Sequence, residues 1–258
     1  MREINLFGRL GNKDNDIKFF LKYLPKDIKN VIEPFGGTFA CIKKEYNDDK
    51  YNKYVNDLDD NLYLIYTNPE LYLECKKKFN EIAEKHLIVD SKTVNYNNFI
   101  EEFNKVEMNI KLKDYIIREC IIRGRMVKIN KTLKTYDFKK YLDFHKKINF
   151  TNDDYKIIID KFKYNEDSFI ILDPPYLFSD NNNYKSQRDD SDMSDIMVYI
   201  LELFNDEKVK CKLLFIINKL KIISYLFKNY IVGEYEKIYQ IAKKKETHLI
   251  IAKNINPS

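Results

Sequence analysis

Short apolar runs alternate with stretches of helical character along this chain, and that alternation constrains the fold more than any other feature. The clearest buried strand, residues 168–173 (SFIILD), is stopped by Pro174 and Pro175, because proline has a fixed φ and no N–H to continue a sheet. Strand-like runs also occupy residues 30–35, 54–58, 148–152 and 213–218. Strands that alternate with helices predict an α/β fold with a mainly parallel sheet covered on both faces.

Helices are expected between these runs, and a hairpin is expected near the end of the sequence. The helices are predicted at residues 38–46, 61–66, 69–85 and 155–162. Residues 235–242 and 247–252 are strand-like runs separated by KKKE, so they predict a hairpin that adds an antiparallel strand. The polar, Asn-rich residues 180–192 follow a strand, and we expect them to form a loop of the kind that α/β enzymes place at substrate sites.

The composition of the 258 residues excludes several classes of protein. Hydrophobic residues make up 44% and charged residues 33%, which is typical of a globular protein. No apolar run reaches the ~18 residues of a membrane span, and the first residues lack the apolar core of a secretory signal. The four cysteines are scattered, with no CxxC pair, which argues against a zinc site or a disulfide framework. We therefore expect an intracellular protein that needs no metal and no membrane.

Positive charge is concentrated in residues 111–147, which carry 12 Lys and Arg against 4 Asp and Glu. This local net charge of +8 exceeds the +5 of the whole chain, and half of the six arginines lie in this stretch. Aromatic residues are interleaved with the basic ones. Such a segment suits a phosphate backbone and stacked bases, but a solvated helical face would have the same composition.

The clearest chemical motif is Asp173-Pro174-Pro175-Tyr176, at the end of the strand predicted at residues 168–173. The two prolines make a stiff turn that holds Asp173 and Tyr176 in a fixed relation. The Asp173 carboxylate and the Pro174 carbonyl can accept the two N–H groups of an aromatic exocyclic amine, and the Tyr176 ring can stack on a planar base. Acceptors placed in advance stabilise the charge that develops on the nitrogen during alkylation.

A second candidate site begins with Gly36 and Gly37, between a predicted strand and a predicted helix. Glycines there let a nucleoside approach the backbone closely, although a tight turn also explains them. Asp57 follows about 20 positions later, where an acidic residue commonly binds a ribose hydroxyl pair. Asp57 can equally cap a helix, and Lys13 can equally be an ordinary capping lysine.

Together these motifs resemble the Dam-type S-adenosylmethionine-dependent DNA adenine-N6 methyltransferases. The resemblance rests on GRLGNK (8–13), EPFGGTF (33–39), YVNDL (54–58) and DPPY (173–176), in that order. It extends through RGRMVKIN (123–130), FTNDDY (150–155) and the closing KKKETHLIIAK (243–253). It implies a Rossmann-like methyltransferase sheet, formed by residues 1–75 and 148–258, and a small, mainly helical recognition domain inserted as residues 76–147.

The resemblance also implies roles for individual residues. Asp173, Pro174, Pro175 and Tyr176 would form the catalytic motif. The candidate contacts to S-adenosylmethionine are Arg9, Lys13, Phe35, Gly36, Gly37, Asp57, Asp153, Asp154 and Asp173. The candidate contacts to double-stranded DNA are Arg118, Arg123, Arg125, Lys128, Lys131 and Lys134.

Two positions depart from the family pattern. Arg9 stands where the family usually has an aromatic residue, and Phe39 replaces the second glycine of its FxGxG segment.

We interpret the chain as an enzyme that methylates the N6 amine of adenine in DNA, with the base flipped out of the duplex. Cytosine-N4 methylation, RNA adenine methylation and a catalytically silent DNA-binding or partner subunit are the alternatives. The target sequence, a role in restriction-modification and the choice between monomer and dimer stay open.

Overall fold

The computed structural model of the protein describes residues 16–87, 94–122, 126–127, 138–175, 190–239 and 244–256. The chain divides into two compact units. The sheet unit comprises Lys13–Asp59 and Lys147–Ser258, and the helical unit contains Asp60–Lys146. The helical unit therefore begins earlier in the chain than the predicted insert of residues 76–147.

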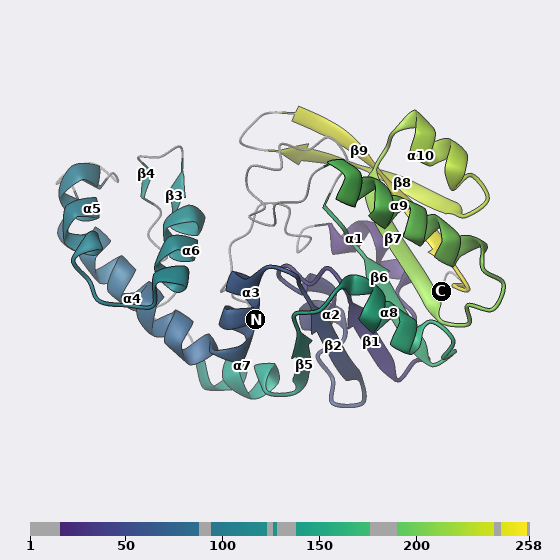
Figure 1. Cartoon of the computed structure of the whole chain (residues 1–258), viewed down its shortest axis with the longest axis horizontal. Coiled ribbons are helices and arrows are strands. Elements are labelled where there is room, and N and C mark those ends of the chain that lie inside the picture. The colour runs from purple at the N-terminus through teal and green to yellow at the C-terminus, as the bar shows by residue number, and fades with distance from the viewer. Residues whose placement is uncertain are drawn as a thin grey trace. The chain divides into compact units, whose positions relative to one another are not determined.

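The sheet unit is built on a seven-stranded sheet of order β5-β2-β1-β6-β7-β9-β8 (Figure 1). Strands β5, β2, β1, β6 and β7 are parallel, and β9 and β8 add the antiparallel hairpin. Their bounds are β1 (Asn30–Glu33), β2 (Asn52–Asn56), β5 (Ile148–Thr151), β6 (Ser168–Leu172), β7 (Lys212–Asn218), β8 (Ile231–Tyr239) and β9 (Lys244–Lys253). The predicted Rossmann-like methyltransferase sheet, mostly parallel with a C-terminal antiparallel hairpin, is confirmed.

Helices cover both faces of this sheet. The helices of the sheet unit are α1 (Ile17–Phe20), the 3₁₀ turn η1 (Leu21–Tyr23), α2 (Ala40–Glu45), α8 (Tyr155–Phe162), α9 (Asp190–Asn205) and α10 (Lys221–Leu226). Residues of α8, α9 and α10 join one core with Ile170, Leu213 and Phe215 of the central strands. On the opposite face, the ring of Tyr46 at the end of α2 packs on Phe169 of β6. Every residue of β6 is buried, as expected for a central parallel strand.

One sequence prediction is wrong where the structure can test it. Residues 190–192, the end of the predicted loop 180–192, form the first turn of α9. Polar composition is common to loops and to the first turn of a helix, so it was misleading there. The rest of the predicted loop lies outside the described residues.

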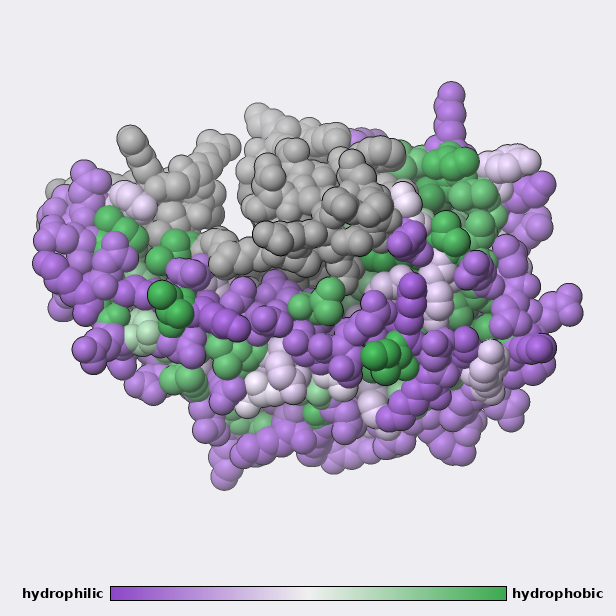
Figure 2. Space-filling view, in the orientation of Figure 1, coloured by the Kyte–Doolittle hydropathy of each residue, from purple (hydrophilic) through white to green (hydrophobic). Residues whose placement is uncertain are grey.

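Helix α10 brings apolar side chains to the surface of the sheet unit. Ile223 packs into the core, whereas Ile222, Tyr225 and Leu226 are exposed. Figure 2 shows hydrophobic surface in the part of the sheet unit that α10 occupies. The helix is thus anchored by one face only.

The helical unit has a core of its own. It contains α3 (Asp60–Thr67), α4 (Pro69–Lys85), α5 (Tyr96–Asn104), α6 (Ile110–Cys120), α7 (Phe138–His145) and a two-stranded pairing of β3 (Ile121–Ile122) with β4 (Met126–Val127). Three fully buried rings, Phe79, Phe99 and Phe103, contact one another at centroid distances of 5.0–5.6 Å. The described part of this unit is mainly helical, as the sequence predicts.

No helix within the described ranges has the length and apolar character that crossing a membrane requires. Among the same residues, no three His, Cys, Asp or Glu side chains are grouped so as to hold a metal ion.

Candidate active site

The order of the strands defines a switch point in the sheet unit. From β1 the sheet extends through β2 and β5 on one side, and through β6 and β7 on the other. In open α/β sheets, ligands bind outside the carboxyl ends of the strands where the order reverses. The carboxyl end of β1 leads to Gly36 and Gly37, and that of β6 leads to Asp173 and Pro174. The topology therefore brings both candidate motifs to one edge of the sheet.

The Asp173 motif follows β6 directly. The strand ends at Leu172, and Asp173 is half-buried, next to the buried Pro174 and the half-buried Pro175. Because Leu172 pairs with Phe215 of β7 and β6 also pairs with β1, Asp173 extends from a strand that is held on both sides. The backbone that leads to Asp173 is thus fixed by the sheet, and Asp173 is only partly buried at the edge. Tyr176 lies outside the described residues.

The glycine turn is tied to the end of β2. The N–H of Gly36 donates to the carbonyl of Asn56 (2.7 Å), and the N–H of Gly37 donates to Oδ2 of Asp57 (2.9 Å). Gly37 has φ +51°, a left-handed conformation that favours glycine. Among the described residues, no atom lies within 4 Å of a Cβ added at Gly37. Close approach of a ligand to this turn is sterically possible.

Asp57 supports this turn with both carboxylate oxygens. Oδ2 accepts the bond from Gly37, and Oδ1 accepts one from the N–H of Asp59 (3.0 Å), two residues on. The second bond has the geometry of an Asx turn before α3. Asp57 therefore shapes the local backbone, and binding of a ribose by the same carboxylate stays a prediction.

Asp153 and Asp154 follow the carboxyl end of β5, and both side chains are exposed. Asp154 is the N-cap of α8, where its Oδ1 accepts a hydrogen bond from the N–H of Lys156 (2.8 Å). The backbone of Asp153 is bonded on both sides to the side chain of Asn56. The structure thus places Asp153 next to the end of β2, and leaves its side chain exposed.

A chain of aromatic contacts holds Phe35, just before the glycine turn. Its ring lies 5.1 Å from that of Tyr155, which lies 5.5 Å from that of Tyr199. The Tyr199 hydroxyl donates to Oδ1 of Asp160 (2.8 Å), and burial together with this bond raises the pKa of Tyr199. Tyr199 is therefore a neutral structural donor, and Phe35 is fixed at the edge of the site.

Phe39 occupies a backbone position suited to glycine. It has φ +39° and ψ +50° at the N-cap of α2, and its side chain is fully buried, with its ring 5.8 Å from that of Phe150. Left-handed backbone costs little for glycine and more for a residue with a Cβ. Glycine would suit this backbone better, and the phenylalanine is accommodated by packing.

Several predicted site residues lie outside the described residues. These are Arg9, Lys13, Tyr176, Arg123, Arg125, Lys128, Lys131 and Lys134. Arg118 belongs to α6 of the helical unit. Hydrogen bonds around the end of β2 bring together Gly36, Gly37, Asp57 and Asp153. Asp173 and Pro174 belong to the same edge of the sheet, because β6 pairs with β1.

Sequence reasoning missed two asparagines at this edge of the sheet. Asn56 ends β2 and is 1% exposed. Asn218 ends β7, and its buried Oδ1 has no hydrogen-bond partner within the described ranges. A polar residue at the end of an apolar strand, as in LLFIIN, was the available signal.

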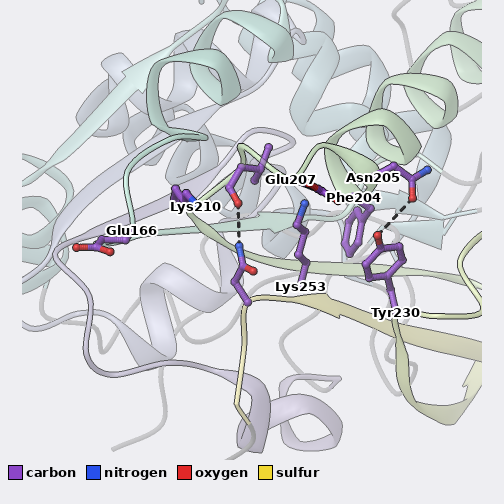
Figure 3. Close-up of a pocket in the computed structure, with 9 residues that line it drawn as sticks. Glu166, Phe204, Asn205, Glu207, Lys210, Tyr230 and Lys253 are labelled. Atoms are coloured by element: carbon purple, nitrogen blue, oxygen red, sulfur yellow. Dashed lines mark hydrogen bonds between the residues drawn. The ribbon is translucent and has the colours of Figure 1, made fainter.

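A cavity of about 490 Å³ lies elsewhere in the sheet unit (Figure 3). Its lining includes Glu166 and Lys210, which precede β6 and β7, so it opens near the amino ends of the parallel strands. Lys253 donates there to the carbonyls of Leu203 and Asp206, and Asn254 donates to the carbonyl of Val209. These bonds close the ends of α9 and its loop, so the polar groups already serve the fold.

The chain has a distant relative among known proteins. The chain is 26% identical to the Type II methyltransferase M.CviBI of Paramecium bursaria Chlorella virus NC1A, over 276 aligned positions. The alignment covers 93% of this chain and 96% of that protein. No protein-family model matches the chain. The similarity therefore extends over both units.

Proposed function

We propose that this protein is an S-adenosylmethionine-dependent DNA methyltransferase that modifies the N6 amine of adenine. The observation that carries the proposal is the meeting, at one switch point, of a glycine turn and an Asp-Pro-Pro segment. The full-length similarity to a Type II methyltransferase supports methyl transfer to DNA. The choice of adenine rests on the Dam-type resemblance.

The residues at the site suit the cofactor. No atom of the described residues crowds a Cβ at Gly37, which leaves room for a ligand against the backbone, and Asp57 and Asp153 supply carboxylates around the end of β2. S-adenosylmethionine supplies an electrophilic methyl group on a sulfonium sulfur. Phe35, Gly36, Gly37, Asp57, Asp153 and Asp154 would bind it, together with Arg9 and Lys13.

The Asp173 carboxylate and the Pro174 carbonyl orient the amine. Each accepts one N–H, which draws the nitrogen lone pair out of conjugation and directs it toward the methyl group. As the bond from nitrogen to the methyl carbon forms, the sulfonium C–S bond would break and the sulfur would leave as a neutral thioether. The nitrogen would carry the positive charge, which the fixed acceptors stabilise, until it loses one proton to solvent. Holding both reactants at one sheet edge also removes much of the entropic cost of their encounter.

The test is replacement of Asp173 by alanine, with Asp167→Ala as the matched control. Asp167 lies at the amino end of the same strand, where it pairs with Lys29 at the surface. Methyl transfer from labelled cofactor to DNA should be lost in Asp173→Ala and kept in Asp167→Ala, with circular dichroism unchanged in both. A folded Asp173→Ala protein with normal turnover would show that the site is elsewhere.

Three further measurements separate the alternative functions. Long-read sequencing of DNA from a methylation-free host that expresses the protein reports whether N6-methyladenine or N4-methylcytosine forms. An assay with labelled RNA tests the hypothesis of RNA adenine methylation. Calorimetry with S-adenosylmethionine tests the hypothesis of a catalytically silent subunit, because such a subunit should bind no cofactor.

A further inference from the structure

We propose that Asn56 is a positioning residue that joins the two loops of the cofactor side into one rigid unit. This inference rests on the proposed function, and it adds a role for a residue that touches neither reactant. Asn56 is the last residue of β2, directly before Asp57. At 1% exposure its polar side chain is buried at the edge of the sheet, where each of its hydrogen-bonding groups needs a partner.

The Asn56 carboxamide has a partner for every donor and lone pair. Nδ2 donates to the carbonyl of Pro34 (3.1 Å) and to that of Asp153 (3.0 Å). Oδ1 accepts from the hydroxyl of Thr151 (2.7 Å) and from the N–H of Asp153 (2.9 Å). These four bonds use the full hydrogen-bonding capacity of an amide.

The orientation of this amide is fixed by its neighbours. A backbone carbonyl can only accept and a backbone N–H can only donate, so Nδ2 must face Pro34 and Oδ1 must face the N–H of Asp153. Asparagine is therefore specifically required: aspartate would lose both donors and place a charge against two carbonyl oxygens. Glutamine would carry the amide one methylene too far.

The two loops that Asn56 joins come from opposite neighbours of β2. Pro34 follows β1 and leads into the glycine turn, whereas Asp153 follows β5 and leads into α8. The backbone of Asn56 adds a bond from Gly36, and Asp57 adds bonds from Gly37 and from the Asn152 side chain. The side chain thus sets the spacing between the candidate contacts on either side of Asp57, so its loss should weaken cofactor binding and leave DNA binding intact.

The test compares Asn56→Asp with Asn149→Asp. Asn149 lies in β5 and is exposed; its side chain also bonds the backbone of β2, at Lys53 (3.2 Å), but within the strands rather than at their carboxyl ends. Thr151→Val removes one bond to Asn56 and serves as a milder variant if Asn56→Asp does not fold. Calorimetry gives the affinity for S-adenosylmethionine, and steady-state assays give the KM for each substrate and kcat.

We expect the dissociation constant for the cofactor to rise at least about tenfold in Asn56→Asp and about threefold in Thr151→Val, because hydrogen bonds around a buried amide are lost. Asn149→Asp should stay within about twofold of the wild type, and the KM for DNA should change little in all three. Wild-type cofactor affinity in Asn56→Asp would overturn the inference. So would an equal loss in Asn149→Asp, or an equal rise in both KM values, since either indicates a general structural effect.

Hydrogen exchange at the Asp153 amide keeps this inference separate from the proposed function. Asn56→Asp keeps an acceptor for that amide but loses the donor to the Asp153 carbonyl and repels it, so this loop should open more often and the amide should exchange faster than in Asn149→Asp, whether or not cofactor is present. A wild-type protein that binds no S-adenosylmethionine would reject the proposed function. Unchanged exchange in the folded variant would reject the positioning role of Asn56.

Discussion

Phe39 shows how one residue can combine a strained backbone with favourable packing. Its positive φ costs of order 1–3 kcal/mol for a residue with a side chain, whereas burying a phenylalanine is worth ~3–5 kcal/mol relative to alanine. Packing against Phe150 and its other buried neighbours therefore outweighs the strain, although glycine would suit this backbone conformation better.

This balance predicts an unusual order of stability for two truncations. Phe39→Ala loses the buried ring and keeps the strain, while Phe39→Gly loses the ring and relieves the strain. We expect the glycine variant to be about 1 kcal/mol more stable than the alanine variant in urea unfolding. The control is Phe99, fully buried in α5, where glycine should instead be about 1 kcal/mol worse than alanine. The same order at both positions would contradict the strain at Phe39.

At the scale of elements, the sequence predicts best where local signals and burial agree. Helix α4 runs from Pro69 to Lys85 as predicted, because proline at the first position starts a helix. Helix α8 also matches, because Asp154 caps it and its apolar residues repeat with helical spacing. Strand β2 is shifted toward the N-terminus by the inclusion of Asn52 and Lys53.

Lys53 illustrates why that strand was misplaced. Its side chain is 1% exposed, and its Nζ donates to the carbonyls of Asp48 and Tyr51, while burial lowers its pKa. A lysine satisfied by nearby carbonyls lies inside the sheet unit, and nothing in the local sequence indicates it. Helix α10 was likewise missed, because its exposed apolar residues blur the expected pattern.

For the candidate site, the sequence locates the motifs and the topology brings them together. Gly36, Asp57 and Asp173 were identified because each follows an apolar run. The role of Asn56 could not be predicted, since its partner Asp153 is 97 positions away along the chain. Such a contact exists only once β5 has paired with β2.

The first element-scale prediction concerns the docking of α1 on β8. Asp16, at the start of α1, is paired with Lys237 of β8 (2.6 Å), and the two side chains are 4% and 15% exposed. Lys237→Met leaves a buried carboxylate without its cation and should cost ~3 kcal/mol in chemical unfolding. The control, Lys219→Met, removes the ion pair with Glu234, which is about half exposed, and should cost under ~1 kcal/mol. Equal costs would show that the Asp16 pair is not effectively buried.

The second element-scale prediction concerns α7 and the pH dependence of folding stability. His145 ends this helix with 3% exposure, and burial lowers its pKa to about 3. Below the unfolded-state pKa of ~6.5 the unfolded chain takes up a proton that the folded chain does not, so stability must fall as the pH falls.

Between about pH 7.5 and about pH 5 this linkage should remove roughly 2 kcal/mol from the free energy of unfolding. His145→Gln should lack that part of the pH dependence, while all other titrating groups contribute equally to both proteins. Urea titrations at the two pH values measure the difference. Parallel pH profiles for the wild type and His145→Gln would contradict a buried, neutral imidazole.

At the scale of the whole molecule, charge divides the chain. Residues 111–147 carry +8, so the rest of the chain carries about −3. Some of this positive charge already serves the fold: Lys113 donates to the carbonyls of Asn104 and Val106, and Lys147 pairs with Asp49. We propose that the remaining basic residues of this segment contact the DNA backbone, including Lys131 and Lys134.

Salt dependence tests this proposal for the full chain. Each phosphate contact contributes about 0.9 to the slope of log affinity against log salt, so a variant with Lys131 and Lys134 both changed to glutamine should lose up to about 1.8 from that slope. It should weaken cognate and scrambled duplexes about equally, because backbone contacts carry no sequence information. Lys113→Gln is the matched control: it removes a lysine of the same segment that bonds carbonyls, so it should lower stability and leave the slope unchanged. Fluorescence anisotropy across a salt series measures both slopes. If the double variant keeps the wild-type slope, this segment does not contact the phosphates, and its basic residues form a solvated surface.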